Sequence, residues 1–231
     1  MKDAGCMLVL ALVVVGAGAL VLLPMRWSHH GHGSNGTAAI ATLRNLTYCQ
    51  AQFQSAKHSD LDGDGIGEFG TFGEMTAAVG IRADAAATTR GSPVNPAILS
   101  PALAAVDGNG IVTKSGHAFR IFLPGPKGKA IHEGMAGPAA PFSGPLDPEA
   151  AETTWCAYAW PVSAGNSGQR VFFVDQGGDV WQTSNADSRY SGFLAAPEWD
   201  AAMPAGGKGW APTPPGTEHR GRDGNLWKCT N

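Results

Sequence analysis

Charged residues are scarce in this chain of 231 residues, and neither sign of charge predominates. They make up 15% of the sequence, and 16 Lys and Arg stand against 19 Asp and Glu, for a formal net charge of -3. An average soluble protein carries about 25% charged residues. A protein that binds nucleic acid needs a basic excess to neutralise phosphates. We therefore expect no nucleic acid among its partners.

Sequence signatures of enzymes are also lacking. The chain contains no GxSxG nucleophile motif, no HExxH zinc motif and no phosphate-binding loop. His117, His132 and His219 are scattered among predicted loops and strands. No small-molecule substrate is evident from these residues, and we expect a protein that is not an enzyme.

Cysteines are few and do not form a metal or redox motif. Three cysteines follow the apolar run, at Cys49, Cys156 and Cys229. At most one disulfide can join two of the three, and the sequence does not show which two would pair. No CxxC spacing occurs, which argues against a zinc ribbon and a thioredoxin-like motif. Cys6 precedes the long apolar run, whereas a lipidated cysteine follows such a run, so we do not expect lipidation.

One long uncharged run is present at the N-terminus. Residues 4–25 contain no charge, and about 20 apolar residues span a bilayer core as a helix. Trp27 suits the membrane interface. A cleaved signal peptide has a shorter apolar stretch, of about 7 to 15 residues, and a small-residue cleavage site, which residues 24–27 do not provide. We therefore predict a transmembrane anchor over residues 1–27.

This anchor predicts a single-pass protein of the inner (cytoplasmic) membrane, with its C-terminal domain extracytoplasmic. The chain has 32 Gly and 16 Pro, about a fifth of the sequence, which predicts a loop-rich fold. Residues 28–36 are polar and rich in glycine, and they predict a flexible joint. An amphipathic helix is predicted over residues 37–56, because apolar residues recur at helical spacing at Ile40, Leu43, Leu46 and Phe53.

Four runs of aromatic and β-branched residues predict strands in the second half of the chain. They cover residues 117–123, 155–162, 170–175 and 179–183. The last two flank a Gly-Gly turn and predict a hairpin. A short antiparallel meander cannot bury its apolar face alone, so we expect the amphipathic helix to pack on it.

The predicted fold class is therefore α+β, with an N-terminal transmembrane helix and an amphipathic helix packed on a small antiparallel sheet. We assign residues 37–205 to this extracytoplasmic domain and residues 206–231 to a C-terminal tail rich in Gly and Pro.

Several stretches resemble the type IV pilins and the pseudopilins of type II secretion. They are Gly5-Cys6-Met7-Leu8-Val9-Leu10 with the apolar run that ends at Pro24, the helix segment Leu43-Arg44-Asn45-Leu46, the acidic stretch 60–70, and residues 115–121. Proteins of this class have a short leader, an apolar N-terminal helix, and a small antiparallel sheet packed on the outer half of that helix. The resemblance covers most of residues 5–185 and implies a pilin-like domain.

Two positions depart from the family pattern. The family's peptidase site is Gly followed by Phe, with Glu at the fifth mature position, whereas here Cys6 follows Gly5 and Leu10 replaces that Glu. The chain is in this respect similar to a minor pseudopilin at a filament tip, or to a protein that has left filament assembly. The resemblance implies a structural or assembly role, with other pilin-like or secretion-system subunits as partners. The alternative is an anchored, exported binding module or enzyme of unknown substrate.

An acidic loop follows the predicted helix. Three aspartates alternate over residues 60–64, and Gly65 follows at the position where a calcium loop bends. Thr71 stands where an EF-hand has its last Glu, which predicts a weak half-site. The alternative is a solvated acidic turn at the helix end. We predict a calcium site formed by Asp60, Asp62, Asp64, the carbonyl of Ile66, and Glu68.

Overall fold

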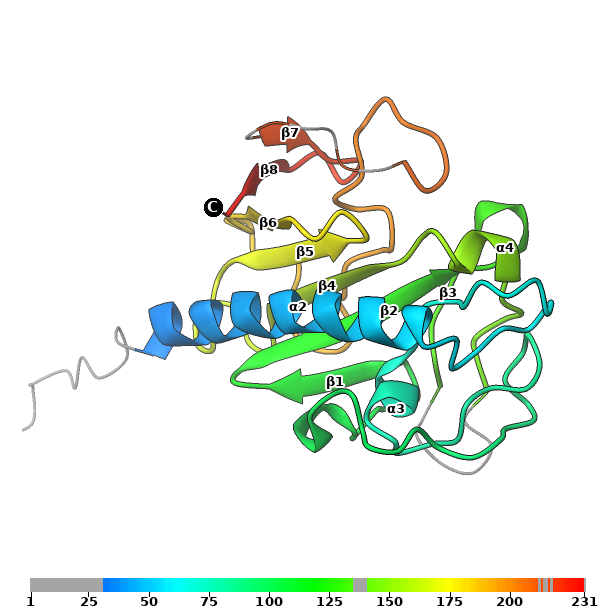
Figure 1. Cartoon of the computed structure of the whole chain (residues 1–231). Coiled ribbons are helices and arrows are strands. Elements are labelled where there is room, and N and C mark those ends of the chain that lie inside the picture. Colours follow the sequence, from blue (N-terminus) through cyan, green and yellow to red (C-terminus); the bar gives the residue numbers. More distant parts are fainter. Residues whose placement is uncertain (1–30, 135–140, 212, 214–215, 217, 231) are drawn as a thin grey trace, which may run out of the picture.

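The computed structural model describes residues 31–134, 141–211, 213, 216 and 218–230. The predicted anchor, residues 1–27, lies outside this part of the chain. Within it, no helix combines the length and the apolar character that crossing a membrane requires. One long helix lies across one face of an antiparallel sheet, and shorter elements surround the pair (Figure 1). This arrangement agrees with the predicted α+β class.

The sheet has eight strands among the described residues and is larger than the predicted meander. Its order is β1-β2-β4-β5-β6-β8-β7, with β3 paired to β2 off this path, and all pairings are antiparallel. In chain order the strands are β1 (Ile111–Lys114), β2 (His117–Pro124), β3 (Ala130–Ile131), β4 (Cys156–Pro161), β5 (Val171–Asp175), β6 (Val180–Thr183), β7 (Glu218–Arg220) and β8 (Leu226–Cys229).

The four strands predicted from the sequence are confirmed as β2, β4, β5 and β6, which are neighbours in the sheet. Their register sets Phe119 opposite Ala159 and Tyr158 opposite Phe173. The predicted hairpin joins β5 to β6, and Gly178 in its turn has a φ of 82°, which glycine adopts without steric cost.

Both faces of the central strands β4 and β5 are buried, by different partners. Ala157 and Ala159 of β4 face the long helix α2 (Gly31–Ser55), and their small size lets the helix approach closely, because the helix distance depends on the contacting side chains. The opposite face of the same strands carries large aromatic rings, which pack beneath the C-terminal part of the chain. This second cluster includes Tyr158, Trp160, Phe173, Trp181, Met203 and Trp227.

The predicted packing of the helix on the sheet is confirmed. Leu43, Leu46 and Phe53 are fully buried, and Ile40 is half-buried against the same cluster. Helix α2 contacts β2, β4, β5 and β6, so it crosses the centre of the sheet. The apolar stripe read from the sequence therefore faces the core.

Helix α2 begins at Gly31, inside the predicted flexible joint of residues 28–36, so the joint is helical from there onward. Tertiary contacts explain the difference. The Nδ2 of Asn35 donates to the Ser167 carbonyl at 2.8 Å, and Gly36 lies against an aromatic ring of β5. These contacts offset the low helix propensity of glycine.

The predicted tail, residues 206–231, differs from expectation because β7 and β8 extend the sheet beyond β6. Trp227 of β8 is fully buried, and a Cβ on Gly221 would lie only 2.6 Å from its Nε1. The Thr230 carbonyl accepts a hydrogen bond from Arg44 of α2 at 2.9 Å. The folded domain therefore continues past residue 205.

The described cysteines form no disulfide with one another. The Sγ of Cys49 lies 3.3 Å from the Ile98 carbonyl, and the Sγ of Cys156 lies 3.5 Å from the Trp199 carbonyl. Burial raises the pKa of both thiols. Both side chains therefore serve as small packing groups of the core.

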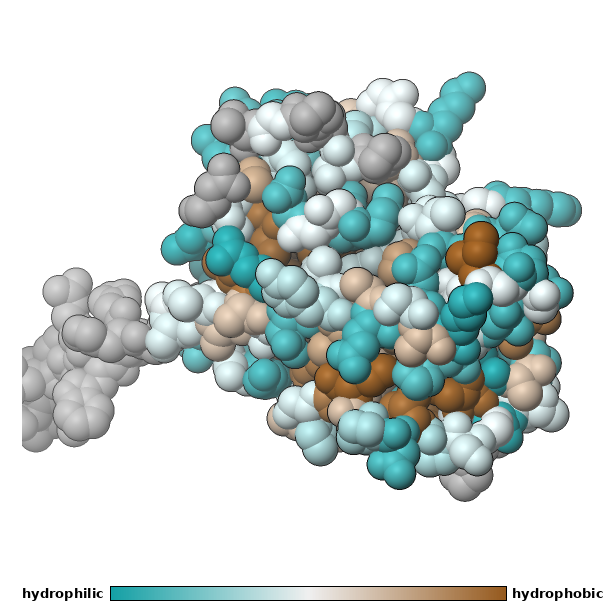
Figure 2. Space-filling model, viewed as in Figure 1, coloured by the Kyte–Doolittle hydropathy of each residue, from teal (hydrophilic) through white to brown (hydrophobic). Residues whose placement is uncertain are grey.

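Polar side chains dominate the surface on the side that carries α2, and small patches of apolar residues are visible beside the helix (Figure 2). Arg44 is the only Asp, Glu, Lys or Arg in α2, and Tyr48 is 76% exposed on its outer face. The outward face of the helix is therefore polar but almost without charge.

Candidate metal centre

The acidic loop starts directly after the C-terminus of α2. The helix ends in a Schellman motif, in which Lys57 has a φ of 52°. The N–H of Lys57 donates to the Gln54 carbonyl at 2.9 Å, and the N–H of His58 donates to the Phe53 carbonyl at 3.4 Å. This cap turns the chain away from the helix axis and into residues 59–68.

The three aspartates of the loop converge. One carboxylate oxygen from each of Asp60, Asp62 and Asp64 lies within 4.8 Å of the others. Gly63 and Gly65 have φ values of 74° and 92°, and their N–H groups both donate to Asp60, at 2.9 and 3.2 Å. A side chain at either glycine would be strained, so the glycines shape the loop around Asp60.

The structure places the other two residues of the predicted set differently. The side chain of Ile66 is exposed, and its N–H donates to Asp64 Oδ1 at 2.7 Å. Glu68 is fully buried: its Oε1 accepts from the Leu61 N–H at 2.6 Å, and its Oε2 lies 3.7 Å from Nη2 of Arg82. The Glu68 carboxylate is thus paired inside the protein, although its Oε2 makes no hydrogen bond among the described residues, and it is not among the converging oxygens.

A buried ion pair, which the sequence did not reveal, holds Glu68 behind the loop. Arg82 is fully buried, and its Nη1 donates to Glu74 Oε2 at 2.6 Å. Its Nη2 donates to the Phe69 carbonyl at 2.6 Å. Glu74 also caps the short helix α3 (Phe72–Met75). A buried pair needs such additional hydrogen bonds to offset the loss of hydration.

A further carboxylate, from a distant part of the chain, interacts electrostatically with the acidic loop. Glu152 follows the short helix α4 (Pro148–Ala151) and is 5% exposed, and its Oε1 has no hydrogen-bond partner among the described residues. Burial raises the pKa of Glu152 to about 7, and the negative charges of Asp64 and Asp62 add to this effect. A nearby cation would stabilise such an unpartnered carboxylate. Sequence spacing carried no signal for it.

The chemistry of these residues fits a hard cation. Carboxylate oxygens are the ligands that calcium prefers, and water can complete its shell of six to eight oxygens. No Cys or His belongs to the converging group, so a soft transition metal is disfavoured. The positive charge of Lys57 would compete with a bound cation for the carboxylates of the loop. Its Nζ lies 3.5 Å from the position that a Cβ on Gly65 would take.

No protein-family model matches this chain, and neither a curated protein nor a solved structure matches it. Its function therefore has to be inferred from the chemistry of its own residues.

Proposed function

We propose that the protein is a membrane-anchored, extracytoplasmic protein of the pilin-like or pseudopilin-like type, with a structural or assembly role. The observation that supports this most is the placement of α2, which starts at Gly31, shortly after the predicted anchor, and lies across an antiparallel sheet. Anchor, helix and sheet in this order are the layout that the resemblance implies. The proposed location is the inner (cytoplasmic) membrane, with a single span.

The outer face of α2 supports contact with other proteins. Charged residues are depleted at the centres of protein interfaces, and tyrosine is enriched there. The outward face of α2 is almost uncharged and presents Tyr48 to solvent. The proposed partners are other pilin-like or secretion-system subunits, and this role requires no catalysis by the chain itself.

Photo-crosslinking of the full chain in cells tests the proposed role. A benzophenone amino acid in place of Tyr48 should give adducts of higher mass that contain a second envelope protein. The same group in place of Lys127, on the exposed turn Pro126–Gly128, serves as the control and should give few adducts. No adduct at position 48, or equal adducts at both positions, would favour an anchored enzyme or binding module instead.

We also propose that the acidic loop binds calcium through Asp60, Asp62 and Asp64, with the Ile66 carbonyl and water completing the shell. The convergence of the three carboxylates and the unpartnered Oε1 of Glu152 support this site. Glu68 is left out of the ligand set because Leu61 and Arg82 already hold its oxygens. Bound calcium would join the end of α2 to the loop.

Thermal unfolding of the full chain in a non-ionic detergent tests the calcium site, with tryptophan fluorescence as the readout. Without the EF-hand Glu, we expect a dissociation constant of about 0.1 to 1 mM. Calcium at ten times this value would stabilise the fold by about 1.4 kcal/mol relative to chelator. Asp62→Asn should abolish the gain, whereas Asp187→Asn, an exposed aspartate outside the loop, should retain it. An unchanged wild-type midpoint at saturating calcium would mean that the loop is only an acidic turn.

A further inference from the structure

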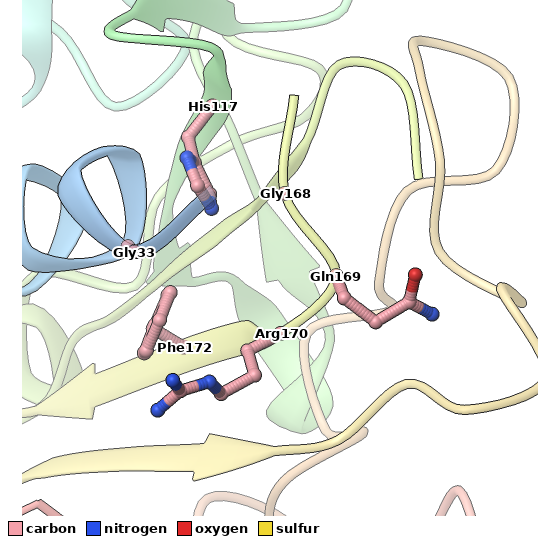
Figure 3. A pocket seen from close by; sticks show the side chains of 7 residues that line it. Gly33, His117, Gly168, Gln169, Arg170 and Phe172 are labelled. Atoms are coloured by element: carbon pink, nitrogen blue, oxygen red, sulfur yellow. The ribbon is translucent and has the colours of Figure 1, made fainter. Parts of the chain in front are cut away.

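A small cavity of about 170 Å³ opens at the N-terminal end of α2, far along the helix from the acidic loop (Figure 3). His117 of β2, Phe172 of β5 and Arg170 line it together with three glycines. The glycines keep the space open, since no atom lies within 4 Å of the position that a Cβ on Gly33 would take. A side chain that is unsatisfied in the protein faces this space.

The imidazole of His117 is that side chain. The residue is 1% exposed, and its Nε2 has no hydrogen-bond partner among the described residues. Its Nδ1 lies 3.5 Å from the Ser115 carbonyl. Burial lowers the pKa of His117, and backbone contacts with Ser115 and Arg170 offset this only in part, so the ring is neutral at pH 7. A neutral imidazole carries one proton, on either nitrogen, so Nε2 is a donor or an acceptor that lacks a hydrogen-bond partner among the described residues.

Arg170 lines the same cavity. It is exposed, and its Nη1 donates to Gln182 Oε1 at 2.9 Å. It forms no ion pair with any residue that the structure describes. A guanidinium with donors to spare binds carboxylates well, often through two parallel hydrogen bonds.

The remaining wall is formed by Phe172, Gln169 and the three glycines. The Phe172 ring lies 5.8 Å from the His117 ring, centroid to centroid. An aromatic ring in the wall favours an organic molecule over inorganic phosphate. We propose that this cavity binds a small carboxylic acid that also carries a hydroxyl or amino group. The carboxylate would pair with Arg170, and the hydroxyl or amino group would hydrogen-bond to Nε2 of His117.

Calorimetric titration of the full chain in detergent tests this site with three probes: lactate, propionate and inorganic phosphate. Lactate has both a carboxylate and a donor, and its expected dissociation constant is on the order of 1 mM, which is within reach of so small a ligand. Propionate has the carboxylate alone and should bind about two- to tenfold more weakly, because the hydrogen bond to His117 is lost. Phosphate should bind more weakly than lactate.

Two variants locate the binding. Arg170→Ala should weaken lactate binding about tenfold or more, since a charge-assisted contact is removed. Gly33→Leu should abolish binding by filling the cavity from the helix side. Arg220→Ala is the matched control, because Arg220 is an exposed arginine of β7 that bonds the Gly224 carbonyl and does not line the cavity. No heat with lactate, equal affinity in Arg170→Ala, equal binding of propionate, or tighter binding of phosphate would each contradict the proposal.

Discussion

A buried carboxylate, that of Glu133, makes the stability of this protein depend on pH. Glu133 is 4% exposed, and its two oxygens accept the N–H groups of Phe72 and Gly73, each at 2.9 Å. Burial raises the pKa of Glu133 to about 7, and the nearby charge of Glu74 adds to the rise. Between the unfolded pKa, near 4.5, and about 7, the folded state holds a proton that the unfolded state has lost. The contribution of Glu133 to stability is therefore full at low pH and is lost as pH rises through this window.

We predict that the free energy of unfolding decreases as pH rises from 5 to 7, with a slope of at most about 1.4 kcal/mol per pH unit from this group. Glu133→Gln removes one titrating group and should reduce the slope, while Glu152, whose pKa is also raised to about 7, keeps its own contribution. Denaturant titrations at several pH values, with chelator present, measure this. Glu198→Gln, at an exposed position, is the control and should keep the wild-type slope. Identical slopes in wild type and Glu133→Gln would show that Glu133 does not titrate in this range.

The candidate metal residues show what the sequence can predict at the scale of residues. The alternation of Asp60, Asp62 and Asp64 is local, so their convergence follows from spacing and from the two glycines. Glu68 is also nearby in sequence, but a buried arginine draws its carboxylate inward. Glu152 meets the loop only through the tertiary fold. Residues that act through long-range contacts leave no pattern of spacing to recognise.

At the scale of elements, segments with a clear apolar or alternating pattern were predictable and the others were not. Helix α2 and strands β2, β4, β5 and β6 have such patterns, and their predicted positions are confirmed. Strands β1, β3, β7 and β8 have two to four residues each, and neighbouring strands of the sheet hold them in place. The first turns of α2 were missed because glycine disfavours helix, and only contacts with β5 and Ser167 reveal them.

Docking of α2 on the sheet buries the apolar face of the helix, and Phe53 tests it. Phe53 is fully buried near the end of the helix and lies against the backbone of Gly70. Phe53→Ala should reduce the free energy of unfolding by about 3 to 5 kcal/mol, since a large buried ring is replaced by a cavity. Tyr48→Ala on the exposed face of the same helix should change it by less than about 0.5 kcal/mol. Chemical denaturation of the full chain in detergent distinguishes them, and similar losses in both variants would argue against the packing described.

At the scale of the whole molecule, the fold is a sheet covered on both sides. The cover predicted from the sequence, α2 on one face, is present. The opposite, aromatic face of β4 and β5 is covered by the C-terminal part of the chain, which was not predicted. That cover could not be predicted, because the segment is rich in Gly and Pro and its strands are short. The same cover explains why β4 is buried along its whole length, although it was expected in a half-covered meander.

The central claim is that this domain stands outside the cytoplasm on a membrane anchor. Protease added to intact spheroplasts that express the full chain, tagged after Asn231, tests it most directly. The account predicts that the tag and the domain are digested from outside, while a cytoplasmic marker protein in the same sample stays whole. Full protection of the domain in intact spheroplasts, together with its digestion after lysis, would contradict the account.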